Sequence, residues 1–182
     1  MVELLNWFQK TYPEHKEALL KCHHNFDHEE INPYHVEGDC WSHTMMVCKI
    51  AELKKYDRVV KVAALLHDIG KPQMRKINPD NKHVQFFGHE ERSFELAKPL
   101  VLDLVVKGFI SSEESLEILE LVLLHGYLYK EQDIKKIEKK FQGKQGLLKH
   151  LLELAECDDL GRFSQTMGKG REKRALLKKM LK

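Results

Sequence analysis

The sequence contains an apolar run that ends abruptly in a histidine and an aspartate. The run covers residues 63–66, His67 and Asp68 follow it, and Gly70 and Pro72 come shortly after. Such a run is typical of a buried helix, which Gly70 can end in a left-handed conformation and which Pro72 cannot continue. Imidazole and carboxylate groups suit divalent transition ions. Because one such pair cannot hold an ion alone, a metal site requires further ligands elsewhere in the chain.

Length and composition predict one soluble domain. The 182 residues are 42% hydrophobic and 32% charged, and no run of about 18 apolar residues suggests a membrane span. The net charge of +2 does not by itself indicate a nucleic-acid-binding protein. The four cysteines have no CxxC spacing, which favours a reducing compartment. Since the first residues also lack a secretory signal pattern, we expect a cytoplasmic protein without a membrane partner.

Helical periodicity dominates the sequence. It predicts helices over residues 2–10, 13–23, 41–53, 59–68, 88–107, 115–125, 131–140 and 146–158. Pro99 lies inside one of them and can kink or divide it. Residues 72–87 are expected to form a loop or a small hairpin. Because there is little other strand signal, the predicted fold class is all-α.

Further candidate ligands stand beside apolar helical runs. They are His43, His89, His125 and Asp158, with Asp159 as a competitor for the last position. Taken singly, a histidine near a helix end can favour the helix dipole, and an aspartate there is commonly solvated. Taken together with the His67-Asp68 pair, they indicate a shared metal site. The other histidines have polar surroundings, and we interpret His23, His24 and His28 as a charged rim.

The order of these residues resembles the HD-domain metal-dependent phosphohydrolases, a family named for its His…His-Asp…Asp pattern. Here the pattern is His43, His67-Asp68 and Asp158, and the resemblance covers about residues 32–162. Three local motifs are similar to the HD domains that accompany bacterial tRNA nucleotidyltransferases and polynucleotide kinases. These motifs are His35-x-Glu37-Gly38-Asp39-x-Trp41-x-His43-Thr44, Phe87-Gly88-His89-Glu90 and Asp158-x-x-Gly161-Arg162.

The resemblance implies a single HD domain with its core at about 32–162 and a basic helical extension at 163–182. It implies that the four signature residues hold one metal ion, that Asp68 bridges to a second, and that His89 and His125 complete the second site. The spacing to the later glycine and arginine favours Asp158 over Asp159. One or two divalent ions are therefore expected, and the ligand types admit Mn, Fe, Co, Ni, Zn or Mg.

Other residues are candidates for substrate contacts and catalysis. The resemblance makes Lys71 a phosphate contact, and we expect it to act in catalysis with Asp68. Arg75 and Arg162 can clamp phosphate, although each can equally be structural. His35 is expected to touch substrate. The nearby acids Glu37 and Asp39 are expected to orient metal-binding histidines or to serve only the loop.

The leading functional prediction is hydrolysis of phosphomonoesters or 2′,3′-cyclic phosphates of nucleotides or RNA ends. A nucleoside 5′-monophosphate phosphatase, a cyclic-nucleotide phosphodiesterase, and a non-catalytic RNA-binding or regulatory module are the alternatives. The C-terminal segment offers a possible RNA contact, or forms a basic helix whose Ala175 and leucines pack on the body. Its basic residues are Lys169, Arg171, Lys173, Arg174, Lys178, Lys179 and Lys182.

Overall fold

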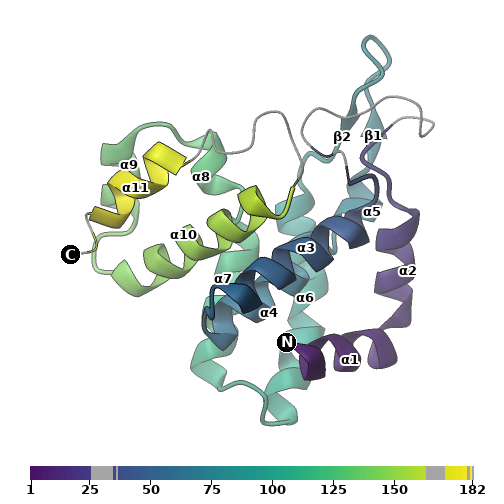
Figure 1. Ribbon diagram of the computed structural model, residues 1–182, viewed down its shortest axis with the longest axis horizontal. Coiled ribbons are helices and arrows are strands. Elements are labelled where there is room, and N and C mark those ends of the chain that lie inside the picture. Colours follow the sequence, from purple (N-terminus) through teal and green to yellow (C-terminus); the bar gives the residue numbers. More distant parts are fainter. Residues whose placement is uncertain (26–34, 36, 163–170, 180, 182) are drawn as a thin grey trace.

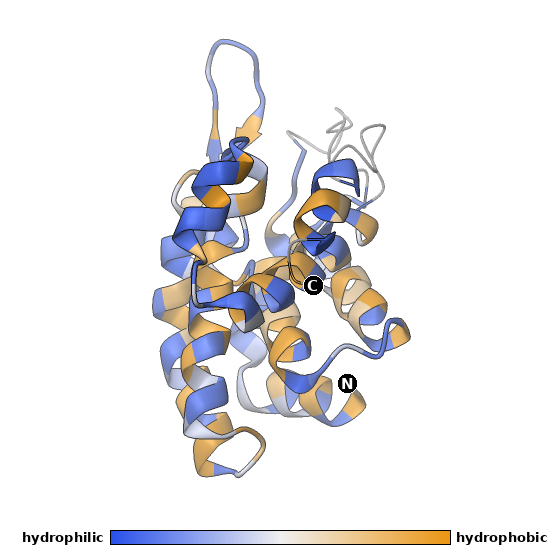
Figure 2. Ribbon diagram, turned by 90° about the vertical axis from the view of Figure 1, so that its left-hand side faces the viewer, coloured by the Kyte–Doolittle hydropathy of each residue, from blue (hydrophilic) through white to orange (hydrophobic). Residues whose placement is uncertain are grey.

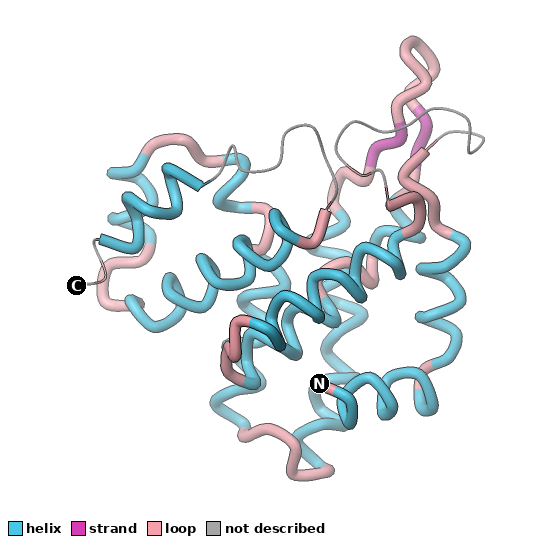
Figure 3. Tube along the Cα trace, in the orientation of Figure 1, coloured by secondary structure: helices cyan, strands magenta, loops and turns pink. Residues whose placement is uncertain are grey.

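The computed structural model describes residues 1–25, 35, 37–162, 171–179 and 181, and within them helices predominate (Figure 3). The predicted all-α class is confirmed. The helices are α1 (Val2–Thr11), α2 (Pro13–Lys21), α3 (Cys40–Leu53), α4 (Arg58–Leu66), α5 (Lys71–Met74), α6 (His89–Val106), α7 (Ser112–Leu124), α8 (Tyr127–Lys130), α9 (Ile134–Lys140), α10 (Gln145–Leu160) and α11 (Arg171–Lys179). The strands are β1 (Lys76–Ile77) and β2 (Val84–Gln85).

Helix α4 lies at the centre of the hydrophobic core. It packs against α3, α7 and α10, and its side chains from Val62 to Leu66 are almost completely inaccessible to solvent. A helix that is apolar on all sides is stable only when its neighbours cover it. Helix α6 runs along α7, and α2 packs against α3 and α5 (Figure 1). Helix α1 packs against α2, and its Trp7 donates a hydrogen bond to Asp103 of α6. The C-terminal end of α4 is thereby fixed inside the molecule.

Side-chain caps determine where several helices begin. Asp39 and Asp57 accept hydrogen bonds from backbone amides in the first turns of α3 and α4, and Ser111 forms a reciprocal capping box at α7. Asp133 caps α9, so this helix starts at Ile134 rather than at residue 131 as predicted. The short helix α8 before it was not predicted. Helix α6 continues through Pro99 without being divided.

The structure corrects the predicted conformation around Gly70. This residue has a right-handed conformation, with φ −83°, and not the left-handed one predicted from the sequence. Glycine is required for space, because a Cβ atom here would lie 2.5 Å from the backbone nitrogen of Ser93. Pro72 does not simply stop a helix but lies in the first turn of α5, where a missing N–H has no cost. The chain after Asp68 therefore turns tightly against α6.

Residues 76–85 form the small hairpin that was one of the two predictions for this region. Strands β1 and β2 pair antiparallel, with Lys76 opposite Gln85 and Ile77 opposite Val84. The hairpin projects beyond the helices (Figure 1), and its tip is hydrophilic (Figure 2). Within the described residues, no helix is both long and apolar enough to cross a membrane.

Helix α11 packs on α10, and several of its basic side chains pair with other groups of the same protein. Arg174 forms an ion pair with Asp159, Lys178 forms one with Glu156, and Lys173 donates hydrogen bonds to backbone carbonyls. Leu177 is buried as predicted, but Ala175 and Leu176 are exposed because they lie on the outer face of the helix. Lys169 and Lys182 lie outside the described residues.

Candidate metal centre

The predicted ligands lie at helix ends that meet at one side of the bundle. His43 is in the first turn of α3, His67 and Asp68 follow α4, and His89 is the first residue of α6. His125 follows α7, and Asp158 lies in the last turn of α10. In Figure 1 these ends lie together below the β1–β2 hairpin. The packing of the apolar helices therefore brings together residues separated by more than 100 positions in the sequence.

The first group consists of His43, His67, Asp68 and Asp158. The Nε2 atom of His43 lies 3.1 Å from Oδ1 of Asp158 and 3.6 Å from Oδ2 of Asp68. The Nε2 atom of His67 lies 3.1 Å from the same Oδ2 atom. All four residues are at most 7% exposed. Two imidazole nitrogens and two carboxylates thus face one small volume in the interior.

The second group shares Asp68 with the first. Its other oxygen, Oδ1, lies 3.4 Å from Nε2 of His89 and 3.6 Å from Nε2 of His125. The two Nε2 atoms of these histidines are only 3.0 Å apart. Asp68 therefore presents one carboxylate oxygen to each group, as a ligand that bridges two ions would.

Hydrogen bonds on the far side of each ring orient the histidines. The Nδ1 atoms of His67, His89 and His125 lie 2.7–2.9 Å from the backbone carbonyls of Ala64, Phe86 and Val122. Since a carbonyl only accepts, Nδ1 is the protonated nitrogen in these rings and Nε2 carries the lone pair. His89 and His125 consequently direct two lone pairs at each other across 3.0 Å, an arrangement that a cation between them would stabilise.

Buried polar atoms at this site also lack hydrogen bonds of suitable geometry to any described residue. They include Nε2 of His43, Nε2 of His67 and both oxygens of Asp68. Oδ2 of Asp68 has an ion pair with Lys71, at 2.7 Å. For the other atoms, burial without a hydrogen bond costs about 1–3 kcal/mol each, and more for charged groups. The residues present therefore fit one or two divalent ions, because coordination would satisfy these atoms.

The electrostatics of the site favour metal binding. Burial opposes ionisation of Asp68 and Asp158, but electrostatic interactions with neighbouring side chains outweigh it, chiefly those of His67 and Lys71 with Asp68 and of Arg162 with Asp158. They hold both pKa values well below the usual range. Burial and the neighbouring His67 and His89 lower the pKa of His125 to about 3. Ionised carboxylates and neutral imidazole are the protonation states that bind metals.

His43 shows the attraction of this site for positive charge. Burial lowers its pKa, but the carboxylates of Asp158 and Glu37 outweigh burial and raise the pKa above its ordinary value. A proton on this ring partly replaces the charge that a metal ion would bring.

A cavity of about 350 Å³ opens next to the metal groups. His35, Lys71 and Arg162 line it, as do metal-ligand candidates from both groups. Lys71 is 6% exposed, and its Nζ atom lies 2.7 Å from Oδ2 of Asp68. Arg162 forms an ion pair of 2.8 Å with Oδ2 of Asp158. Two cations thus border the volume in which a substrate would meet the ligands.

Arg75 does not line this cavity. Its guanidinium group donates hydrogen bonds to the backbone carbonyls of His23, at 2.9 Å, and Asn25, at 2.8 Å. These contacts agree with the structural role, which was one of the two predictions for Arg75. Asp39 likewise acts as the N-cap of α3, with its carboxylate on Ser42.

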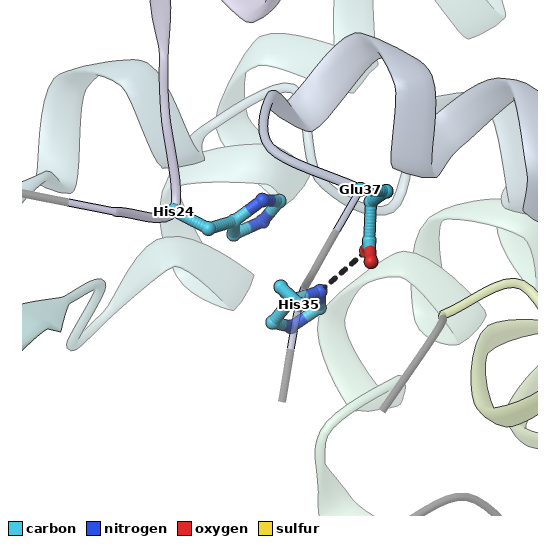
Figure 4. A group of neighbouring side chains, drawn as sticks. All are labelled: His24, His35 and Glu37. Carbon is cyan, nitrogen blue, oxygen red and sulfur yellow. Dashed lines mark hydrogen bonds and ion pairs between the residues drawn. The ribbon is translucent and has the colours of Figure 1, made fainter. Parts of the chain in front are cut away.

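Glu37 and His24 support the site from the side of the loop before α3. Oε1 of Glu37 lies 2.7 Å from Nδ1 of His35 (Figure 4) and 3.0 Å from Nδ1 of His43, so Glu37 can orient both rings. The prediction that His24 belongs to a charged rim is wrong, because His24 is 1% exposed and stacks on His35 with ring centroids 4.0 Å apart. His28 lies outside the described residues.

His24, His35 and Glu37 satisfy the distances for a further metal site, but the ring geometry opposes it. The rings of His24 and His35 are parallel to within 6°. Because an imidazole lone pair lies in the ring plane, two parallel rings 4.0 Å apart cannot both point at one ion. We therefore interpret His24 as a support for His35.

Two residues at the site, Glu90 and Tyr129, were not predicted from the sequence to take part in it. Glu90 is buried, lies 3.3 Å from Nδ1 of His89 and forms an ion pair of 2.6 Å with Lys130. Tyr129 lines the cavity, and the Arg162 guanidinium lies 4.8 Å from its ring centroid. Glu90 stands directly after a candidate ligand in the sequence, which is a usable signal. The sequence contains no comparable signal for Tyr129, which lies in the short helix α8 that was not predicted.

Comparison with known proteins agrees with this geometry. The HD domain family matches residues 40–160. The chain belongs to the HD domain family. HD domains bind divalent metals and are generally metal-dependent phosphohydrolases, and the His and Asp groups of this structure fit that chemistry.

Among curated proteins, the Multifunctional CCA protein of Burkholderia multivorans is 43% identical over 67 residues. The corresponding protein of Paraburkholderia phymatum is 42% identical over 67 residues. Each match covers 37% of this HD-domain chain and 15% of the relative. The similarity therefore concerns a small part of these longer proteins.

Proposed function

We propose that this HD-domain protein hydrolyses phosphomonoesters or 2′,3′-cyclic phosphates of nucleotides or RNA ends. The observation that carries the proposal is the pair of ligand groups that share Asp68 beside a cavity bordered by Lys71 and Arg162. In this proposal His43, His67, Asp68 and Asp158 hold one divalent ion, and Asp68, His89 and His125 hold a second. When bound, such ions lower the pKa of a coordinated water from 15.7 towards about 7 and neutralise phosphoryl charge.

Lys71 binds the phosphoryl group in this proposal. Burial lowers the pKa of its ammonium group, but the carboxylate of Asp68 outweighs burial and raises the pKa above its ordinary value. Lys71 therefore remains a cation at neutral pH, in a site where burial strengthens its attraction for phosphate. Arg162 and His35 lie on the same cavity and are further candidates for substrate contacts.

Asp68 combines the roles of ligand and orienting group. Because its pKa is held well below the usual range, its carboxylate is ionised and can accept a hydrogen bond from a water molecule that approaches the phosphorus atom. The group is 2% exposed and contacts Lys71, which limits its movement. The same arrangement would orient water and phosphate toward each other.

The relatives support nucleotides or RNA ends as the substrate class. The 67-residue similarity is to proteins named Multifunctional CCA protein, and three sequence motifs resemble HD domains that accompany tRNA nucleotidyltransferases. On α11, the exposed cations Arg171 and Lys179 remain for contacts with RNA phosphates.

The test is hydrolysis by protein stripped of metal, with Mn²⁺, Ni²⁺, Co²⁺, Zn²⁺ or Mg²⁺ restored singly. The substrates are a 2′,3′-cyclic nucleotide, 2′-, 3′- and 5′-nucleotides, and a 3′,5′-cyclic nucleotide, which also tests the two alternative activities. We expect metal-dependent turnover that His67→Ala abolishes. The matched variant His150→Ala should retain it, since His150 pairs with Asp57 and Glu117 away from the cavity. Absence of turnover by folded, metal-loaded protein would contradict the proposal and favour a binding or regulatory module.

A further inference from the structure

The cavity beside the metal groups has a charged floor and an aromatic rim. Asp68 and Lys71 are buried at the floor, whereas Phe86, Phe87 and Tyr129 line other parts of the cavity. A ligand that matches both regions has an anionic group at one end and a flat apolar group at the other. Nucleotides have this distribution, because a phosphate and a base are joined through a sugar.

Two of the three aromatic rings already have polar partners. The Lys71 ammonium lies 5.4 Å from the centroid of Phe86, and the Arg162 guanidinium lies 4.8 Å from that of Tyr129. The hydroxyl of Tyr129 also donates a hydrogen bond of 3.0 Å to the carbonyl of Ala155. These contacts hold both rings in the walls of the cavity.

Phe87 differs from them because its ring makes no contact with another ring or cation among the described residues. It is 76% exposed, and it is the one exposed large hydrophobic residue of the described chain that lines the cavity. Single exposed apolar side chains are common on proteins, so exposure alone indicates nothing. Exposure of a planar ring on a cavity that also contains a buried cation and the metal-ligand candidates is more specific.

The local backbone fixes the place of Phe87. The residue follows β2, and Gly88 has a left-handed conformation, with φ +80°, which reverses the chain into α6. Only Gly88 separates Phe87 from His89, so their Cα atoms lie within about 7 Å of each other. The backbone of Phe87 is therefore fixed close to His89, between β2 and α6, and its side chain lines the same cavity as Lys71 and the metal groups.

We propose that Phe87 is a stacking platform for the base of a nucleotide whose phosphate lies at Lys71 and the metal groups. The inference rests on the proposed function and specifies how its substrate is recognised. Stacking on an aromatic ring tolerates every base, because each base has a π-face. The platform would therefore accept either a free nucleotide or the terminal nucleotide of an RNA, with larger purines held more tightly than pyrimidines.

The test compares ligands with and without a base in a binding assay. Metal-loaded protein is titrated by calorimetry with non-hydrolysable phosphonate analogues of adenosine 5′-phosphate and of ribose 5-phosphate. We expect Phe87→Ala to weaken binding of the adenosine analogue about 5- to 100-fold, with no corresponding change for the ribose analogue. Phe87→Trp should retain affinity for the adenosine analogue, and Phe87→Leu should lose most of the affinity that the base provides.

Leu102→Ala is the control, since Leu102 is also exposed but does not line the cavity. It should bind both analogues like the unmodified protein. A second arm uses a short single-stranded RNA with a 3′-phosphonate and the same RNA with an abasic last nucleotide. A Phe87-dependent difference in this arm assigns the platform to RNA ends, and a difference confined to the mononucleotides assigns it to free nucleotides.

The proposal is overturned if the unmodified protein does not prefer the base-containing ligand in either arm. It is equally overturned if Phe87→Ala weakens ligands with and without a base by the same factor. Base-dependent binding through Phe87 without any hydrolysis would leave the platform standing and would refute the proposed phosphohydrolase function. The two proposals can therefore fail separately.

Discussion

Replacing Glu37 by glutamine tests how the site holds His43. One carboxylate oxygen of Glu37 lies 2.7 Å from Nδ1 of His35 and 3.0 Å from Nδ1 of His43, and the side chain is 3% exposed. Burial raises the pKa of this carboxyl, but its contacts with the two histidines outweigh burial and lower the pKa to about 2. Glu37 is therefore ionised whenever the histidines can bind metal.

The expected loss follows from the change in charge. A hydrogen bond to a charged group contributes about 1.5–3 kcal/mol and a neutral one about 0.5–1.5 kcal/mol. Glutamine has the same size and an oxygen that can accept the same contact, but it has no charge. The interaction that orients His43 should therefore weaken by roughly 1–2 kcal/mol. This corresponds to a metal affinity about 10-fold lower, at the lower end of the 10- to 100-fold typical for partners of metal-binding histidines.

Competition with a chelator of known affinity measures this change, and circular dichroism checks that the variant is folded. Asp39→Asn is the matched control from the same loop. Asp39 caps α3 through a hydrogen bond of 2.8 Å from the amide of Ser42, and asparagine caps equally well. The reasoning is refuted if Glu37→Gln binds metal like the unmodified protein, or if Asp39→Asn loses as much affinity.

Three further predictions concern catalysis, packing and pH. In the proposed function Lys71 is a buried cation that binds phosphate, so Lys71→Met should lower kcat/KM about 100-fold without weakening metal binding. Steady-state kinetics showing an unchanged kcat/KM would contradict this role. Gly70→Ala should destabilise the fold by roughly 1–3 kcal/mol, because the added methyl group collides with the backbone of α6. Gly146→Ala is the control: a Cβ atom there has nothing within 4 Å, so the variant should be neutral or more stable by up to about 1 kcal/mol. Urea denaturation measures both, and equal effects would be inconsistent with the tight turn at Gly70. Burial raises the pKa of Glu156, but its contacts with Lys178 and Lys54 outweigh burial and lower the pKa from 4.5 to about 2. The ion pairs of Glu156 therefore stabilise the fold above pH 4.5, and this stabilisation is lost as the pH falls through about 2. Glu156→Gln should thus cost roughly 1 kcal/mol near neutral pH, after solvent screening, and little near pH 2; a loss of stability that does not depend on pH would argue against the ion pairs.

The ligand set could be predicted from the sequence because each ligand adjoins an apolar helical run. Packing of α3, α4, α6, α7 and α10 around one core necessarily brings several of their ends together. The choice of Asp158 over Asp159 also agrees with the structure, since Asp158 faces His43 and Asp159 pairs with Arg174 at 2.5 Å. Adjacent helical residues point in directions about 100° apart, which agrees with Asp158 facing the site and Asp159 facing α11.

Residues outside helices were harder to predict. His24 is buried because residues 22–24 pair with 38–40 through backbone hydrogen bonds and the bridge between His23 and Asp39. This pairing joins segments about 16 residues apart and leaves no local pattern in the sequence. Arg75 is similar, because its acceptors are backbone carbonyls that any residue type could provide. The places of His24 and Arg75 are therefore determined by contacts with backbone groups that are distant in the sequence.

The most direct test of the metal centre is an anomalous difference map from crystals grown with Mn²⁺. We expect one or two peaks, the first among His43, His67, Asp68 and Asp158, and any second among Asp68, His89 and His125. The His24, His35 and Glu37 group should show none, because its stacked rings cannot share an ion. Peaks only at that group or at Asp57, His150 and Glu153, or no peak beside Asp68, would contradict the account.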